Sequence, residues 1–285
     1  MMTSAVYLSS STSAAFENTT TKFTKTSRII PSESDLPTLY VYDHCPFCVR
    51  VRAVFGLKNI KHNLFFLAND DVITPTNLVG KKISPIYEWK VSGICMPESL
   101  DIIANVDSDD RMGPTEMILP ATGRDDLKGW QSSVRDLLRS LQRPRYVATG
   151  LLPEFQQLDG RIAFIKNHEM VGYTKDEWKK SEPPMSIEQK IEIYNTAFQK
   201  DPATDIEELN RKLIELDDII YCEQYVTDVA PNSHGNCISI DDIDLFARLR
   251  SITIIKNVNW PTKLRNYMDY MSQLTDIPLY DAMAM

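Results

Sequence analysis

Near residue 40 the pattern of apolar residues is typical of a strand, and within ten residues it changes to the spacing of a helix. TLYVYD at 38–43 is β-branched and aromatic, which is typical of a strand. From Val51 to Leu57 the apolar residues recur near the helical spacing, and turn residues follow up to Asn59. The pattern therefore predicts a strand followed directly by a helix.

Similar patterns continue to residue 107. HNLFFL at 62–67 predicts a second strand, and Thr74-Pro75 predicts the start of a short helix. Further segments are interpreted as a strand from 83–87, a strand from 93–96 and an amphipathic helix over 98–106. The predicted order is β-α-β-α-β-β-α.

No strand pattern is found after residue 123. Apolar residues lie on one helical face from Trp130 to Leu141, and residues 159–184 are polar and irregular, which indicates a long loop or insertion. The other segments with helical spacing are 186–199, 204–221, 241–256 and 261–273. We predict an α/β domain over 38–107, a turn-rich linker over 108–123 and an all-helical domain over 124–285.

Residues 1–37 are set apart from the fold by composition. They hold eight Ser and seven Thr and have no hydrophobic period, and residues 1–30 contain a single acid, Glu17. Such a segment is either a disordered leader or an organelle transit peptide, and the sequence leaves both open. The expected location is accordingly the cytoplasm, or a plastid or mitochondrion if the leader is a transit peptide.

Charge and hydropathy exclude two classes of partner. No apolar run approaches the ~18 residues of a membrane span, so no membrane is expected. The net charge of -8 comes from residues 108–285, while 38–107 hold seven basic and seven acidic groups. Binding to a phosphate backbone needs a basic face, so nucleic acid is not an expected partner. The cysteine count of five is odd, which disfavours a secreted disulfide framework.

The motif Cys45-Pro46-Phe47-Cys48 carries the candidate chemistry. Between a strand and a helix, Cys45 falls at the N-cap and Pro46 at the first helical position. Free amides and the helix dipole then favour the Cys45 thiolate, and Arg50 and Arg52 are expected to add supporting positive charge. We predict that Cys45 attacks disulfides and that Cys48, one turn deeper, resolves the product.

The same motif is also half of a zinc site, but two further ligands at suitable spacing are missing. We therefore expect no metal. Of the nearby residues, His44 is expected to be an exposed bystander rather than a modulator of the nucleophile, and Cys95 a packed core thiol rather than a third redox thiol. Cys222 and Cys237 are expected to be inert, buried or half-buried thiols.

From Leu39 onward the chain resembles the two-domain bacterial glutaredoxins of the glutaredoxin 2 type. The matching stretches lie in both predicted domains: LYVYDHCPFC, VFGLKNI, NDDVITPTNLVGKK, PIYE, MPESLDI, SIDDIDLF and NWPTKLRNY. The resemblance implies a thioredoxin-like domain followed by an all-α glutathione-transferase-like domain. The chain departs from it in residues 1–37, in extra length within about 145–235, and in Phe47 where a Tyr is usual.

The resemblance also implies a glutathione site. Pro85 matches the cis-proline that faces the active cysteine, and the Ser84 backbone would pair with the cysteinyl part of glutathione. The Glu98-Ser99 pair, at the start of a predicted helix, would hold the γ-glutamyl end. Together with Cys45, Pro46 and Phe47, these residues form the predicted glutathione-binding set.

The first functional hypothesis is a glutathione-dependent thiol-disulfide oxidoreductase. It would reduce protein–glutathione mixed disulfides and protein disulfides, with glutathione as cosubstrate, and the family resemblance favours a monomer. One alternative is a glutathione transferase, although that reaction usually uses a Ser or Tyr hydroxyl to hold the glutathione thiolate. The other is a non-enzymatic binding module or an iron–sulfur carrier, in which Cys45 of two chains plus glutathione would supply four thiolates.

Overall fold

The computed structural model describes residues 35–285, so the leader prediction for 1–37 lies almost wholly outside the described residues. Its sheet is four-stranded, with the order β2-β1-β3-β4. β2 runs parallel to β1, while β3 is antiparallel to both β1 and β4. The strands are β1 (Thr38–Val41), β2 (Asn63–Phe66), β3 (Ile86–Trp89) and β4 (Ile94–Pro97).

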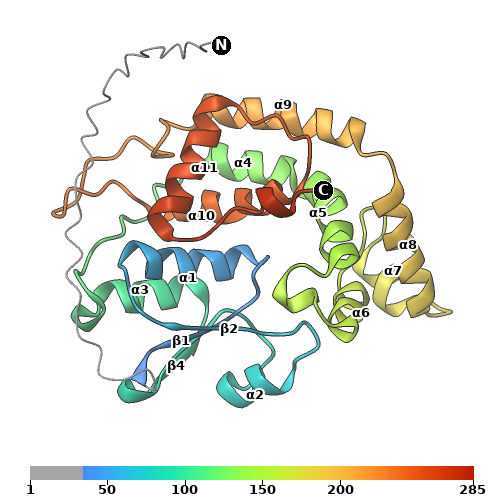
Figure 1. Ribbon diagram of the computed structural model, residues 1–285, viewed down its shortest axis with the longest axis horizontal. Helices are drawn as coiled ribbons and strands as arrows, with labels where there is room; N and C mark the ends of the chain where they lie inside the picture. The colour runs from blue at the N-terminus through green and yellow to red at the C-terminus, as the bar shows by residue number, and fades with distance from the viewer. Residues whose placement is uncertain (1–34) are drawn as a thin grey trace, which may run out of the picture.

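Three helices accompany this sheet in the predicted order. They are α1 (Pro46–Leu57), α2 (Ile73–Val79) and α3 (Ser99–Ser108). Figure 1 shows α1 and α3 between the sheet and the remaining helices, with α2 on the far side of the strands. The sheet domain therefore has the thioredoxin-like β-α-β-α-β-β-α arrangement expected from the sequence.

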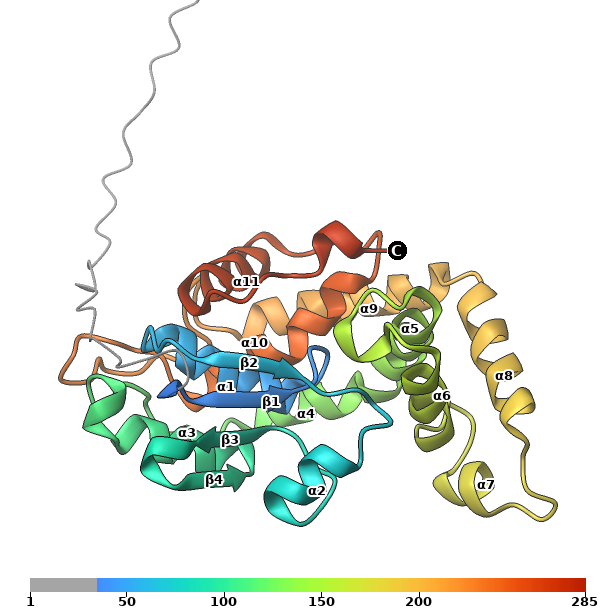
Figure 2. The ribbon, with the colours of Figure 1, turned by 60° about the horizontal axis from the view of Figure 1, so that its bottom comes forward.

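The rest of the chain is helical, as predicted, and we call it the helical domain. Figure 2 shows α4, α9 and α11 around α10, while α6 to α8 form a group at one end. Among residues 124–285 no strand is formed; only an isolated bridge joins Ser239 to Leu119. The helices are α4 (Asp125–Ser133), α5 (Arg135–Thr149), α6 (Leu158–Asn167), α7 (Lys175–Lys180), α8 (Ile187–Gln199), α9 (Ala203–Ile219), α10 (Ile240–Leu249) and α11 (Thr262–Thr275).

The prediction of a long loop over 159–184 was wrong, whereas the alternative of an insertion stays a prediction. This stretch contains α6 and α7, and it contributes buried side chains to the core, including Phe164 and Trp178. The indole of Trp178 donates a hydrogen bond to the Ile165 carbonyl at 2.9 Å. Polar residues dominate the sequence here because each short helix buries only a few side chains, and so the apolar period is weak.

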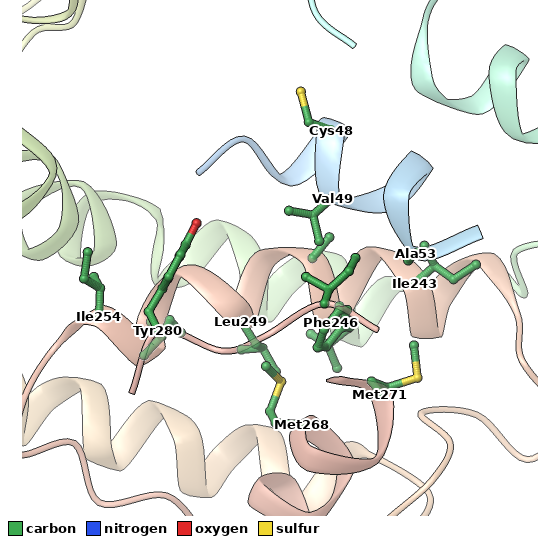
Figure 3. Close-up of a cluster of buried hydrophobic side chains, with 14 of the residues drawn as sticks. Cys48, Val49, Ala53, Ile243, Phe246, Leu249, Ile254, Met268, Met271 and Tyr280 are labelled. Atoms are coloured by element: carbon green, nitrogen blue, oxygen red, sulfur yellow. The ribbon is translucent and has the colours of Figure 1, made fainter. Parts of the chain in front are cut away.

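Helix α1 forms the centre of the packing between the two domains. Most of its residues are buried, because the sheet covers one side of it and the helical domain covers another. Figure 3 shows Val49 and Ala53 directed toward Ile243 and Phe246 of α10, while the Cys48 sulfur points to the opposite side of α1. The redox motif thus begins a helix that is held from two directions.

A buried polar network joins the domains next to the start of α1. Arg250 of the helical domain donates to both carboxylate oxygens of Asp43, at 3.2 and 3.3 Å, and Tyr280 donates to the same carboxylate at 2.7 Å. Arg52 of α1 pairs with it at 2.5 Å. Burial alone would raise the pKa of Asp43, but Arg250 and Arg52 lower it, so the carboxylate is ionised.

The predicted linker accepts hydrogen bonds from both domains. Asn232 and Asn236 donate to backbone carbonyls of Met117 at 3.1 and 2.6 Å. Lys58 of the sheet domain donates to the Pro114 carbonyl at 2.7 Å. The domain bounds 38–107, 108–123 and 124–285 stay a prediction. The segment 108–123 is hydrogen-bonded both to the sheet domain and to the helical domain. Within residues 35–285, no helix has the length and apolar character needed to cross a bilayer.

The contact between α1 and α11 yields a stability prediction. A Cβ on Gly56 would lie 1.8 Å from the carbonyl oxygen of Thr275, a backbone atom that cannot move aside. Gly56→Ala is therefore expected to lower the free energy of unfolding by about 1–3 kcal/mol, measured by urea denaturation.

The matched control is Gly129→Ala in α4, where a Cβ meets no atom within 4 Å. That substitution should raise the free energy of unfolding by about 0.5–1 kcal/mol, because alanine loses less backbone entropy in a helix. Equal effects of the two substitutions would contradict the close α1–α11 contact.

Candidate functional site

Cys45 lies at the N-cap of α1, as predicted, in extended backbone conformation. Pro46 occupies the first helical turn, where its missing N–H leaves no hydrogen bond unmade. The Cys45 thiol is half-buried, whereas Cys48, on the first turn of the helix, is fully buried. The two thiols therefore differ in access, with Cys45 the outer one.

The environment of Cys45 stabilises its thiolate. A hydrogen bond from the Cys48 thiol is the largest influence, and it lowers the Cys45 pKa to about 6 against the opposing effect of burial. The charge of His44 and the amides of Cys48 and Phe47 lower the pKa further. The predicted role of the helix start is consistent with this arrangement, although the neighbouring thiol contributes more than the amides do.

Cys48 has the opposite character. Burial raises its pKa well above that of a free thiol, and the adjacent Cys45 raises it further. The Tyr42 amide donates to its sulfur at 3.3 Å, and the Ser84 hydroxyl lies 3.1 Å from it. At neutral pH Cys48 is thus a protonated thiol that donates to a Cys45 thiolate.

Strand register gathers the other predicted site residues at one end of the sheet. Tyr40 near the end of β1 pairs with Ile86 at the start of β3, and Ile86 pairs with Pro97 at the end of β4. Three pieces of chain therefore lie side by side at this end of the sheet. They are the segment from β1 to Cys45, the turn at Pro85 before β3 and the segment from β4 to Glu98. The structure therefore brings together three predicted pieces that are far apart in the sequence.

The Ser84–Pro85 peptide bond is cis, as predicted. The Ser84 hydroxyl donates to the Tyr40 carbonyl at 3.2 Å and also approaches the Cys48 sulfur. These contacts place the turn before β3 against the redox helix, and they leave a backbone edge at Ser84 beside the motif.

Glu98 and Ser99 begin α3, as predicted. Glu98 is the N-cap and has a φ of 73°, a left-handed conformation that is uncommon for a residue with a side chain. Its side chain is exposed and forms a 3.3 Å ion pair with Lys81, while Ser99 is buried. Unusual backbone at the end of a helix that faces a candidate site is a recognised mark of a binding position.

Phe47 is 46% exposed on the outer face of the motif. The Arg50 guanidinium lies over its ring, 5.0 Å from the centroid. An exposed aromatic ring next to a reactive thiol provides an apolar contact for a ligand bound at Cys45.

The expectation that Arg50 and Arg52 supply positive charge to Cys45 is not supported. Arg50 donates to Asp244 of α10 at 2.6 Å, and Arg52 is paired with Asp43. Both guanidinium groups are thus neutralised by carboxylates and act in the contact between the domains. The sequence places both arginines one or two turns past the cysteine. It does not reveal whether their side chains turn toward the cysteine or toward a partner domain.

His44 was wrongly interpreted as an exposed bystander. Its side chain is only 16% exposed, and its ring Nδ1 forms a short contact with the buried Glu154, which lies in the turn Pro153–Phe155 of the helical domain. The His44 backbone N–H also donates to Glu154, at 2.9 Å. No local pattern in the sequence reveals a partner so far away along the chain.

The prediction for Cys95 was also wrong, since this residue is exposed on β4. Its pKa is raised, first by partial burial and then by the charge of Glu88, so it is a poor nucleophile. Cys222 and Cys237 are half-buried and free, as expected. In the part of the chain that the structure describes, no group of three or more His, Cys, Asp or Glu residues is arranged to hold a metal ion.

Comparisons with known proteins point to one family. The family model for the C-terminal domain of glutaredoxin 2 matches residues 126–284. Glutaredoxin 2 of Escherichia coli K12 is 31% identical over 247 residues, which cover 86% of this chain and 99% of that protein. The crystal structure of Salmonella typhimurium glutaredoxin 2 in complex with glutathione superposes with a TM-score of 0.67 at 32% identity. The superposition covers 88% of this chain and 100% of that structure.

The two cysteines yield a prediction about reactivity. The rate of iodoacetamide alkylation of Cys45 should rise with pH through a midpoint near 6, below the ~8.5 of a free thiol. Cys48→Ala removes the hydrogen bond to the sulfur and should raise this midpoint, whereas Cys48→Ser keeps a donor and should change it little. A midpoint that is the same in the Ala and Ser variants would show that the Cys48 hydrogen bond is unimportant.

Proposed function

The chain belongs to the glutaredoxin 2 family, and from this premise we propose that it reduces protein–glutathione mixed disulfides and protein disulfides through Cys45, with Cys48 as the resolving thiol. The family makes it a glutathione-disulfide oxidoreductase with a glutathione-transferase-like architecture. The observation that carries the assignment of roles is the pair of opposed thiol pKa values. Cys45 is the accessible thiolate, and Cys48 is the buried, protonated partner.

The first step is attack of the Cys45 thiolate on the glutathione sulfur of a mixed disulfide. A bond forms between Cys45 and that sulfur while the original S–S bond breaks, and the substrate leaves as a thiolate that takes a proton. Cys45 is then joined to glutathione. A free glutathione, as thiolate, attacks this bond, releases glutathione disulfide and restores the Cys45 thiolate, so each turnover consumes one free glutathione and the substrate's own glutathionyl group leaves in the glutathione disulfide.

A protein disulfide follows a different second step. Cys45 first forms a mixed disulfide with the substrate, and Cys48 then loses its proton and attacks the Cys45 sulfur. The substrate leaves fully reduced, and a Cys45–Cys48 disulfide remains, which two glutathiones reduce. Because the Cys48 thiol already donates to Cys45, its sulfur is placed for this attack.

Glutathione would lie along the end of the sheet where the site residues gather. Its cysteinyl backbone would pair with Ser84 beside Pro85. Its γ-glutamyl carboxylate would meet the first turn of α3 at Ser99, and its γ-glutamyl ammonium would meet Glu98. Phe47 and Pro46 would cover the sulfur from outside. A complex with glutathione is known for the Salmonella typhimurium relative, which supports the choice of this ligand.

The division of roles is tested by the reduction of a small glutathione mixed disulfide and of a protein disulfide. Cys45→Ser should abolish both activities, because no nucleophile remains. Cys48→Ser should keep the first activity and lose most of the second, because only the dithiol route needs Cys48. An inactive wild-type protein that instead conjugates a chloronitrobenzene electrophile would indicate a glutathione transferase.

The glutathione seat is tested by Glu98→Gln. This substitution removes the charge that would bind the γ-glutamyl ammonium, so the KM for glutathione should rise by about tenfold, with kcat little changed, as for a lost charged hydrogen bond. Glu116→Gln is the control. It removes the same charge at another exposed residue with positive φ, in the segment between the domains. Equal KM values for both variants would place glutathione elsewhere.

A further inference from the structure

Glu154 is a buried carboxylate whose side chain is paired with a single titratable residue, His44. Its side chain has no exposure to solvent. Its Oε1 accepts from both the backbone N–H and the ring of His44, while its Oε2 has no hydrogen-bond partner. A carboxylate taken out of water is costly unless it is paired, so its retention here depends on His44.

We propose that Glu154 of the helical domain is a positioning residue for the redox reaction, because it holds the His44 imidazolium beside Cys45. In this way the helical domain sets the reactivity of a thiol that the sheet domain carries. The proposal rests on the proposed function, in which Cys45 is the nucleophile.

The position of Glu154 depends on docking of the domains. The Asn69 side chain, in the sheet domain, donates to the Glu154 carbonyl at 3.0 Å. A Cβ on Gly160 of α6 would lie 2.7 Å from the same carbonyl and 3.7 Å from the Asn69 amide. The turn that carries Glu154 is therefore pressed between α6 and the loop after β2, and it has little freedom to move away from His44.

Among the described residues, 35–285, no second carboxylate is paired with the His44 ring. Three aromatic rings of the helical domain lie 5.1–5.6 Å from its ring: those of Tyr146, Phe155 and Phe164. They pack against the imidazole and limit its contact with water to a small part of its surface. Apolar walls on these sides strengthen the electrostatic effect of the one carboxylate that reaches the ring.

The titratable groups that face His44 leave Glu154 as the anion that controls it. Burial raises the pKa of the Tyr42 and Tyr146 hydroxyls, so both are neutral, and it lowers the pKa of His168 to about 4, so this ring is neutral as well. Asp43 is ionised but bound by Arg52 and Arg250. Within the part of the chain that the structure describes, the other charged group that acts on His44 is the Cys45 thiolate.

The direction of the effect follows from these charges. Burial alone would lower the pKa of His44, but the hydrogen bond and charge of Glu154 raise it above the ordinary value. Glu154 in turn has a lowered pKa, because His44 outweighs the effect of its burial. Both shifts favour the charged pair, imidazolium and carboxylate, over the neutral pair. The imidazolium belongs to the residue next to Cys45, so it is the charge that favours the thiolate.

The test measures iodoacetamide alkylation of Cys45 against pH in Glu154→Gln, His44→Gln and the double variant. Glu154→Gln keeps the size and one acceptor but removes the charge, so the midpoint should rise by about one pH unit, the scale of a lost opposite charge. If Glu154 acts through His44, the double variant should show no larger shift than His44→Gln alone. Glu154→Asp keeps the charge on a shorter side chain, so it should raise the midpoint less than Glu154→Gln does.

The control is Glu169→Gln. Glu169 is a largely buried carboxylate of the helical domain that is paired with Arg143 rather than with His44, and its removal should leave the Cys45 midpoint unchanged. Thermal unfolding of each variant separates a loss of stability from a change in the thiol. An unchanged midpoint in folded Glu154→Gln, or additive shifts in the double variant, would overturn the proposal.

A redox titration against glutathione provides a second readout. A less stabilised thiolate stabilises the reduced form less, so the Cys45–Cys48 potential of Glu154→Gln should fall, by at most about 30 mV for a tenfold change in the equilibrium constant. The alkylation assay contains no glutathione. A wild-type protein without reductase activity would therefore count against the proposed function, while the alkylation shifts would still decide the role of Glu154.

Discussion

The placement of α1 between the sheet and the helical domain governs the rest of this structure. The helix VRVRAVFGL is apolar on more than one side, so it cannot be satisfied by the sheet alone. The second apolar surface is covered by α10 and α11, and the approach is so close that only glycine fits at position 56. Because the redox motif forms the first turn of α1, whatever holds this helix also holds Cys45.

Charged groups at the domain contact contribute specificity more than net stability. Two basic residues on α1, Arg50 and Arg52, each bind a carboxylate, and Asp43 also receives Arg250 and Tyr280. Paired charges that are largely buried return little free energy after their desolvation, but breaking one partner is costly. Such a network penalises any other docking of the domains, which explains how a two-domain protein keeps one geometry around a thiol near their contact.

The two thiols of the motif show how a single helix turn separates two chemical roles. The same sulfur–sulfur contact lowers the pKa of Cys45 and raises that of Cys48, because one thiol donates to the other's thiolate. Burial decides which of the two is the donor. The inner position of Cys48 makes its charged form expensive, and so the negative charge collects on the outer, accessible sulfur.

The sequence alone determined the element order of the sheet domain, the N-cap position of Cys45 and the start of α3 at Glu98, because each depends on residues near in the chain. The cis bond before Pro85 was expected from the resemblance to a known family. Helices α6 and α7 escaped prediction, since their few buried residues leave a weak apolar period. Only the tertiary structure decided which charges act on Cys45. Arg50 and Arg52 turn to carboxylates at the domain contact, while His44 meets Glu154, 110 positions away. Charge interactions depend on distance in space and on burial, and neither can be read from spacing along the chain.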